Sequence, residues 1–288
     1  MTKIRKVVIP VAGLGTRLLP ATKAQPKEML PVVDKPIIQY IVEEAVKAGI
    51  KDVILVTGST KRAIEDHFDR NEILEQTLKK SGKIKYYQDV KKVAELANFI
   101  YIRQQGPYGN GTPVLNAQKI IGDEPFAVVW GDDIWQCPTK PHLKQLIEVY
   151  EKYGDPVLTA IKTDDEGTRK YGIIDGVEVE AGVYQIKSIT EKPGPHKTKS
   201  RLASLGGFIF TPDIFKMLEQ TKLGKDNELW LVDAIAKLQK TRPIYAKVVD
   251  GTFYDPGSKL GWLKANVEFG LKDKEIQKEF KKFLKSKI

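Results

Sequence analysis

The most constraining feature of this chain is an apolar run that leads directly into a glycine-rich, cationic loop. Residues 7–11 form the run, and the loop follows from Ala12 through Arg17 to Lys27. Such a run predicts a buried strand. Glycines let backbone amides turn toward an anion, while Arg17 and Lys27 bring positive charge to the same place. The sequence therefore predicts a polyphosphate site at the end of the first strand.

A dinucleotide-binding loop is one alternative for Gly13 and Gly15, and an ordinary strand and loop is the other. The dinucleotide fold needs a third small residue and an unbroken helix directly after the loop. Here Leu18 occupies the small-residue position, and three prolines follow before residue 32. The next apolar run, 53–56, is not followed by the acidic residue that would hold a ribose hydroxyl. An NAD-dependent oxidoreductase is therefore disfavoured.

Composition is that of a globular protein. The 288 residues are 41% hydrophobic and 29% charged, which is enough to bury a core in one large domain or two small ones. No run of about eighteen apolar residues and no secretion leader is present, so we expect a cytoplasmic protein without a membrane partner. The single Cys137 excludes an internal disulfide, and the three histidines do not have zinc-ligand spacing.

The net charge of +10 raises the possibility of nucleic-acid binding. Part of it comes from residues 271–288, where seven lysines stand against three acids. Five apolar residues recur there at near-helical spacing, which predicts an amphipathic helix with a solvated basic face. Basic residues are not interleaved with aromatic ones, so we expect no nucleic-acid partner. The apolar stripe would pack on its own domain or on another subunit, and we expect a homodimer or homotetramer.

Short apolar runs alternate with amphipathic stretches along the chain, which predicts an α/β fold with a largely parallel central sheet. The expected strands lie near residues 6–11, 52–57, 99–103, 126–130 and 156–162. Because proline suits the first helical turn, we expect helices to begin at Pro36, Thr112-Pro113 and Thr211-Pro212. Residues 170–210 are rich in strand patterns and predict a sub-region appended over the ends of the strands.

Two aspartates are expected where open α/β sheets bind ligands, at the carboxyl ends of strands. Asp132 follows the apolar run 126–130, and Asp255 follows a second run, 244–249. Carboxylate oxygens suit Mg²⁺, so both residues are candidate metal ligands. A turn or a helix cap explains an aspartate at either position equally well.

Glu191-Lys192-Pro193 is a further candidate, because proline disfavours the helical conformation for the residue before it. We expect Lys192 to be extended, so that Glu191 and Lys192 point in different directions. Glu191 could then bind sugar hydroxyls while Lys192 reaches a phosphate. A solvent-exposed Glu-Lys pair is the alternative.

These residues carry a resemblance to a known family. The most specific blocks are residues 12–17, 26–31 and 34–40, followed in order by Arg103-Gln104, Tyr171-Gly172, 191–193, 233–235 and 255–261. On these blocks the chain resembles the sugar nucleotidyltransferases, in particular the prokaryotic-type UTP–glucose-1-phosphate uridylyltransferases. The resemblance implies a Rossmann-like three-layer α/β/α fold with a mixed, mostly parallel sheet. It further implies a nucleotidyltransferase domain over 1–262, with a strand-rich sugar-binding region at about 163–210, and a helical segment over 263–288.

The resemblance also implies a role for each candidate residue. For the nucleotide it implies contacts by Ala12, Gly13, Gly15, Gln104 and Gly109. For charge neutralisation during transfer it implies three catalytic cations, Arg17, Lys27 and Lys192. For glucose hydroxyls it implies Gly172 and Glu191. For the cofactor, Mg²⁺, it implies Asp132 and Asp255.

The implied reaction is the attack of glucose 1-phosphate on the α-phosphorus of UTP, giving UDP-glucose and pyrophosphate. A phosphate monoester has a second pKa near 6, so it is already anionic at neutral pH and needs no general base. What the reaction needs is close placement of two polyanions with neutralisation of their charge. The small number of histidines is therefore no obstacle.

Three departures from the family pattern affect substrate choice. Trp130-Gly131 stands where a Leu-Pro pair is usual, residues 110–113 replace a Gly-His-Ala block, and Trp230 replaces a Gln. The first two flank the expected base pocket and metal. A glucose-1-phosphate thymidylyltransferase, or an enzyme that uses both UTP and dTTP, therefore remains open, since the two bases differ by one methyl group.

Overall fold

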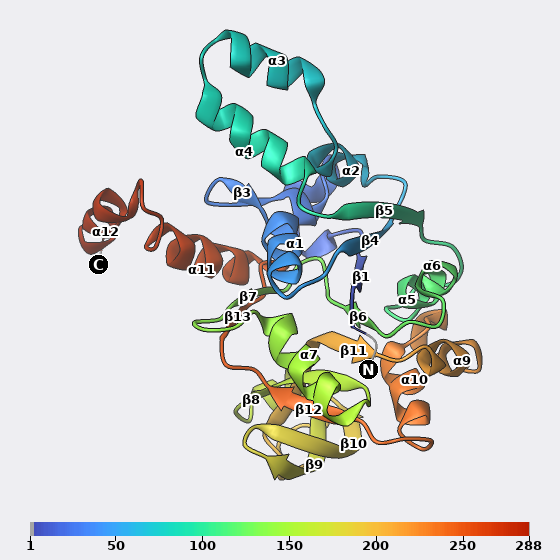
Figure 1. The fold of residues 1–288 in the computed structure, drawn as a ribbon. Coiled ribbons are helices and arrows are strands. Elements are labelled where there is room, and N and C mark those ends of the chain that lie inside the picture. Colours follow the sequence, from blue (N-terminus) through green and yellow to red (C-terminus); the bar gives the residue numbers. More distant parts are fainter. Residues whose placement is uncertain (1–2, 288) are drawn as a thin grey trace.

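The expected apolar runs form strands of one sheet in the computed structural model, which describes residues 3–287 (Figure 1). The sheet has nine strands in the order β5-β4-β1-β6-β11-β8-β12-β10-β9. Their bounds are β1 (Lys6–Pro10), β4 (Asp52–Thr57), β5 (Asn98–Arg103), β6 (Phe126–Val128), β8 (Val157–Lys162), β9 (Gly172–Glu180), β10 (Val183–Glu191), β11 (Leu202–Phe210) and β12 (Tyr245–Val248). All five expected strands are confirmed, although β6 ends two residues earlier than expected.

The sheet is mixed, and most of its strands share one direction. The pairs β5–β4, β4–β1, β1–β6 and β8–β12 are parallel. The strands β10 and β11 pair antiparallel with all their neighbours, so they run opposite to the other seven. The carboxyl ends of β1, β4 and β6 therefore meet at one edge, where the glycine-rich loop also lies.

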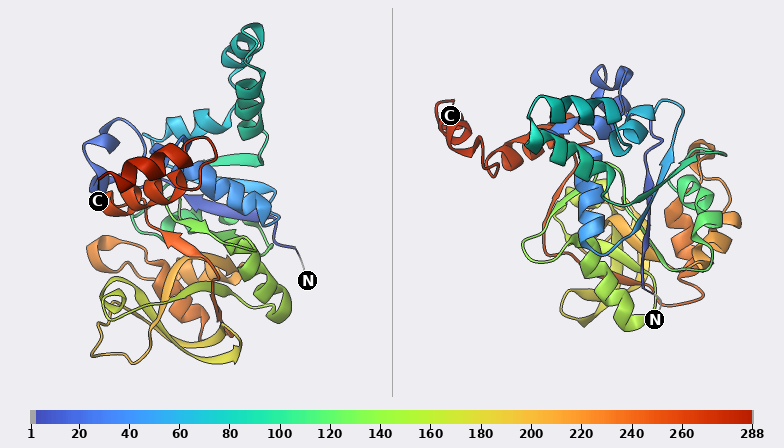
Figure 2. Two further views of the ribbon diagram at one scale, coloured as in Figure 1. Left: turned by 90° about the vertical axis from the view of Figure 1, so that its left-hand side faces the viewer. Right: turned by 45° about the horizontal axis from the view of Figure 1, so that its top comes forward.

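Successive side chains of the strands point into two separate cores. Val7 and Ile9 belong to one core, with α1 (Ile37–Lys47) and α7 (His142–Tyr153). Val8 belongs to the other core, with α5 (Thr112–Asn116), α9 (Asp213–Glu219) and α10 (Leu231–Leu238). Helices thus cover both faces of the sheet (Figure 2). A strand buried on both faces needs the continuous apolar run seen in residues 7–9.

The expected helix starts are confirmed in α1, α5 and α9, which begin within one residue of a proline. The two helices on the first face are joined by a buried carboxylate. The Leu143 amide in the first turn of α7 donates to Glu44 Oε1 of α1 at 2.9 Å. Burial raises the pKa of Glu44 to about 7, against the effect of this hydrogen bond.

Residues 170–210 are rich in strands as expected, with β9 and β10 at the edge of the sheet, but the expectation that the whole region is an appendage is wrong for β11. The strand β11 lies inside the sheet, between β6 and β8, while β9 pairs with both β10 and β11. Eight of the nine residues of β11 are buried. A strand buried on both sides occupies the interior of a sheet, so this region is continuous with the main core.

Two parts of the chain project from the sheet (Figures 1 and 2). One is a helical hairpin of α3 (Glu72–Lys80) and α4 (Ile84–Ala94), and the other is α11 (Lys259–Gly270) with α12 (Gln277–Lys285). The amphipathic segment expected over 271–288 is helical in α12, and residue 262, the expected domain boundary, falls inside α11. Within residues 3–287 no helix is both long and apolar enough to cross a bilayer.

The remaining elements are short. The helices α2 (Arg62–Phe68), α6 (Gln118–Ile121) and α8 (Gly167–Lys170) lie in connections between strands. Two small antiparallel two-stranded sheets complete the fold, β2 (Pro31–Val32) with β3 (Lys35–Pro36), and β7 (Ile134–Gln136) with β13 (Thr252–Tyr254).

Acid sensitivity should arise from the buried histidine of α7. His142 is 1% exposed, and its Nε2 lies 2.6 Å from Thr159 Oγ1, which donates to the Gly207 carbonyl. Burial lowers the pKa of His142 from 6.5 to about 3. The unfolded chain therefore binds a proton that the folded chain does not, so stability falls as the pH drops below 6.5. The loss from this group approaches about 1.4 kcal/mol per pH unit.

We expect His142→Asn to flatten the dependence of the unfolding free energy on pH between pH 6 and pH 4. Urea denaturation at each pH measures this dependence. Glu44 works in the opposite direction but is common to both proteins, so it cancels in the comparison. His196→Asn, in a loop, is the matched control and should leave the slope unchanged. An identical slope in wild type and His142→Asn would contradict the assignment.

Candidate active site

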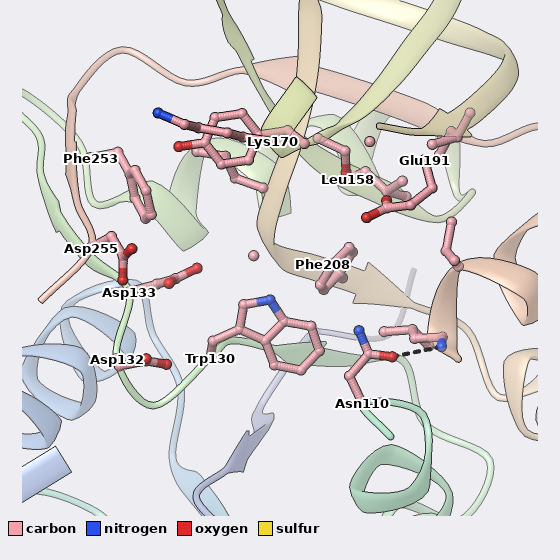
Figure 3. Close-up of a pocket in the computed structure, with 18 of the residues that line it drawn as sticks. Asn110, Trp130, Asp132, Asp133, Leu158, Lys170, Glu191, Phe208, Phe253 and Asp255 are labelled. Atoms are coloured by element: carbon pink, nitrogen blue, oxygen red, sulfur yellow. Dashed lines mark hydrogen bonds between the residues drawn. The ribbon is translucent and has the colours of Figure 1, made fainter. Parts of the chain in front are cut away.

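Two adjoining cavities lie at the carboxyl ends of β1, β4 and β6. The sheet cavity has a volume of about 360 Å³ and lies between the end of β6 and strands β9, β10 and β11 (Figure 3). The loop cavity has a volume of about 290 Å³ and lies between residues 10–13 and 104–113. The two cavities have four lining residues in common, Lys27, Asn110, Trp130 and Asp132. Two ligands that filled them would therefore touch.

The loop cavity brings together four of the five residues expected to bind the nucleotide, namely Ala12, Gly13, Gln104 and Gly109. Gly109 has a positive φ of 118°, and a Cβ there would collide with the backbone of Leu229. Glycine is thus required at this position. A narrow groove lined by backbone suits the flat edge of a base.

Gly15 is the fifth residue expected at the nucleotide, and it lines neither cavity. Its φ of +67° places it in the left-handed region, where it reverses the chain before Arg17. Its carbonyl accepts a hydrogen bond from Thr22 Oγ1 at 2.8 Å. The glycine therefore shapes the loop, and its role at the nucleotide stays a prediction.

The glycine-rich loop is fixed to α2 by a buried ion pair. Lys61 Nζ lies 2.9 Å from Glu28 Oε2, and the two side chains are only 3% and 1% exposed. Burial raises the pKa of Glu28, and the neighbouring Lys61 and Lys27 act against this. Sequence reasoning missed Lys61, because a lysine in a polar stretch gives no sign that it will be buried with a partner 33 residues away.

Three ion-pair contacts join the loop to the ends of other strands. Lys27 Nζ lies 2.6 Å from Asp132 Oδ2. Arg17 reaches Asp132 Oδ2 at 3.7 Å and Asp255 Oδ2 at 3.6 Å. Burial acts to lower the pKa of Lys27, but the carboxylates of Asp132 and Glu28 outweigh it, so its pKa is raised. Lys27 is thus held in its charged form.

Asp132 and Asp255 meet because β13 pairs with β7, which places Tyr254 opposite Ile134. A Cβ built on Gly257 would collide with Asp132 Oδ2 and lie 3.0 Å from Asp255 Oδ1, so both carboxylates face one small space. Oxygen donors around such a space fit Mg²⁺, which keeps several waters and phosphate oxygens among its ligands. Within residues 3–287 no cluster of three or more metal-binding side chains occurs.

Asp133 adds a third carboxylate to this end of the sheet. Burial raises its pKa well above the usual range, and the negative charges of Asp132 and Asp255 add to the effect. The sequence pairs Asp133 with Asp132, but which of the two faces the cations depends on the turn after β6. The structure turns Asp132 toward Lys27 and Arg17.

The sheet cavity also holds the residues expected at the sugar, Gly172 and Glu191. They are direct partners across the β9–β10 pair. A Cβ at residue 172 would lie 3.2 Å from Glu191 Oε2, so a side chain there would crowd the carboxylate. This register gives Glu191 space to project into the cavity, as Figure 3 shows.

Lys192 lines the sheet cavity, but its expected extended backbone is wrong. Its φ is +45°, in the left-handed region, and its amide donates to the Tyr171 carbonyl at 3.2 Å. This turn brings Lys192 Nζ within 3.3 Å of Glu191 Oε1. The end of the β9–β10 pair overrides the local preference imposed by Pro193. Strained backbone at a non-glycine residue is concentrated at functional sites.

The departures from the family pattern fall in different places. Asn110 and Trp130 line both cavities, and Asn110 Oδ1 accepts a hydrogen bond from the Leu231 amide at 2.8 Å. Trp230 lines neither cavity and packs on Gly224. In the sequence, Trp130 lies near Asp132 and Asn110 follows Gly109, and this proximity to candidate site residues indicated that both could line the site.

The sequence of this chain is similar to those of known proteins. Residues 6–269 match the family described as nucleotidyl transferase. A protein of Bacillus subtilis (strain 168) named UTP–glucose-1-phosphate uridylyltransferase is 50% identical over 284 residues, 99% of this chain and 97% of that protein. Its namesake from Staphylococcus haemolyticus is 49% identical over 285 residues and 99% of both chains.

Solved structures give the same result. A UTP-bound UGPase from Acinetobacter baumannii superposes with a TM-score of 0.92 at 38% identity, over 98% of each chain. A UDP-glucose pyrophosphorylase complexed with UDP-glucose superposes with a TM-score of 0.84 at 41% identity, over 94% of this chain and all of the other. The chain therefore belongs to the nucleotidyl transferase family and, within it, to the UTP–glucose-1-phosphate uridylyltransferases.

Proposed function

We propose that this chain makes UDP-glucose and pyrophosphate from UTP and glucose 1-phosphate. The observation that carries the proposal is the pair of adjoining cavities with one cation and carboxylate cluster at their junction. Two polyanionic substrates need such a junction, because each cavity must present one reacting phosphate to the other. Relatives that cover the whole chain at about half identity carry the name of this activity.

UTP is proposed to bind with its base in the loop cavity and its phosphates toward the cations. Gln104 and Gly109 would read the uracil edge, and the backbone of Ala12 and Gly13 would approach the nucleotide closely. Arg17 and Lys27 would hold the phosphates. Both cations already lie against carboxylates, and these contacts hold the two side chains at the junction before a substrate arrives.

Glucose 1-phosphate is proposed to bind in the sheet cavity. Gly172 and Glu191 would bind sugar hydroxyls, and Lys192 would hold the phosphate. The neighbouring contact between Lys192 and Glu191 supports this division, since one ligand that carries hydroxyls and a phosphate can satisfy both side chains.

In the proposed reaction an oxygen of the sugar phosphate forms a bond to the α-phosphorus of UTP. The bond from that phosphorus to the bridging oxygen breaks in line, and pyrophosphate leaves with the electron pair. No proton has to be removed from the nucleophile. Arg17, Lys27 and Lys192 would stabilise the charge that builds up during transfer. Asp132 and Asp255 would hold Mg²⁺, which would supply further neutralisation of the phosphates.

Several finer assignments belong to the same proposal. They are a Rossmann-like three-layer arrangement, a catalytic domain over 1–262 with a sugar-binding region at about 163–210, and a C-terminal segment over 263–288. A cytoplasmic location and a homodimer or homotetramer are proposed as well. Helices on both sheet faces support the layering, and the exposed apolar side chain of Phe283 on α12 supports association.

Removal of a cation should slow turnover. Arg17→Ala and Lys192→Ala are each expected to lower kcat by about 100-fold, because each removes a fixed electrostatic contact to a transferring phosphate. Release of pyrophosphate from UTP and glucose 1-phosphate measures the rate. Lys23→Ala is the matched control, since Lys23 lies in the same loop outside both cavities. Turnover near the wild-type value in either cavity variant would refute its assignment.

Metal dependence should weaken when a carboxylate is neutralised. Asp132→Asn is expected to shift the Mg²⁺ concentration for half-maximal activity upward, because an amide oxygen is a poorer ligand than a carboxylate. A magnesium titration at saturating substrates measures the shift. Asp250→Asn, on the exposed turn before β13, should titrate as the wild type does. The same titration midpoint for Asp132→Asn would remove Asp132 from the metal site.

Nucleotide choice can be decided by a pyrophosphate-release screen of nucleoside triphosphates against sugar 1-phosphates. We expect UTP with glucose 1-phosphate to give the highest kcat/KM. Activity with dTTP is expected to be lower, because its base carries an extra methyl group, worth about 1–3 kcal/mol, and its sugar lacks the 2′-hydroxyl. A preference for dTTP would favour the thymidylyltransferase alternative instead.

A further inference from the structure

We infer that Trp130 is a specificity-determining residue of the sheet cavity that contacts the sugar ring directly. The inference rests on the proposed function and assigns a role to a side chain that departs from the family pattern. Trp130 follows β6 and precedes Asp132 by two residues, so it lies beside the proposed metal ligand. Figure 3 shows its indole between Asp132 and Asn110, with Lys170 and Glu191 on the opposite wall.

The indole is held in a fixed orientation. Its ring packs edge-on against Phe208, with 5.6 Å between the ring centroids and 67° between the planes. It also lies close to the backbone of β11, where any side chain at residue 206 would collide with it. A large ring with two rigid supports provides a preformed wall and loses little entropy when a ligand binds.

The indole also has a free hydrogen-bond donor. Within residues 3–287, Nε1 of Trp130 has no hydrogen-bond partner, and an indole nitrogen can only donate. Asn110 Oδ1 already accepts from the Leu231 amide, and Asp133 Oδ2 lies near the indole nitrogen without a hydrogen bond to it. Nε1 of Trp130 is not among the buried unpaired polar atoms of the described residues, so this donor on the cavity wall is open to a ligand that carries an acceptor.

A hexose supplies both features that this wall can bind. Its hydroxyl oxygens accept hydrogen bonds, and its C–H groups pack against an aromatic face. Glu191 on the opposite wall accepts hydrogen bonds from hydroxyls, so the two walls would hold the ring from both sides. The Leu-Pro pair usual at this position has neither a side-chain hydrogen-bond donor nor an aromatic ring. The indole should therefore tune sugar affinity and limit the size of the sugar that fits.

The test compares the binding of UDP-glucose and UDP, because the difference isolates the contribution of the glucose. Isothermal titration calorimetry with Mg²⁺ and without pyrophosphate measures both dissociation constants with no turnover. Trp130→Phe removes the donor and keeps a ring, and we expect it to weaken UDP-glucose binding by about 3–10-fold while UDP binding is unchanged. Trp130→Leu should weaken UDP-glucose further and increase the relative use of N-acetylglucosamine 1-phosphate in turnover.

Trp230→Phe is the matched control, because Trp230 is another departure that lies outside both cavities. It should bind both ligands as the wild type does. Equal affinity for UDP-glucose in wild type and both Trp130 variants would overturn the inference and leave the proposed function standing. An equal loss of UDP and UDP-glucose affinity would also overturn it, by placing the indole at the nucleotide. Failure of the wild type to bind UDP-glucose would overturn the proposed function, and this inference with it.

Discussion

The contact between Lys27 and Asp132 is the interaction on which the rest of the site depends. Lys27 is only 18% exposed, and a charge that is removed from water needs a partner of opposite sign. Asp132 supplies this partner from the end of β6, 105 residues along the chain. The pair fixes the glycine-rich loop over the sheet, and Arg17 extends the same contact to Asp255. Lys27 and Asp132 line both cavities, so this contact lies where the two cavities meet.

The placement of titratable groups matches a reaction that depends on position and charge. The buried His142 lies in the packing between α7 and the sheet, and His67 hydrogen-bonds to Gln39 away from both cavities. The groups at the junction are cations, which can neutralise phosphates, and carboxylates, which can hold a metal. Trp130 and Asn110 line both cavities and shape their walls, while the charged groups attract the phosphates of the substrates.

Much of this arrangement could be predicted from local pattern. The strands were marked by apolar runs, the helix α1 by Pro36 and its apolar stripe, and the loop by glycines beside Arg17. Other features could not, because they depend on neighbours distant in the chain. Lys192 adopts a positive φ where Pro193 favours an extended residue, since its amide is bound by the Tyr171 carbonyl. Similarly, β11 lies inside the sheet although it reads as part of a separate strand-rich region.

The sequence by itself determined which segments become strands and helices, and which chemical groups stand at their ends. Such information is local, because it follows from periodicity, proline and glycine positions, and the charge of single residues. Only the tertiary structure decided that Arg17 meets both Asp132 and Asp255 and that Lys61 is buried against Glu28. These contacts join residues tens to hundreds of positions apart, and strand order and register bring them together.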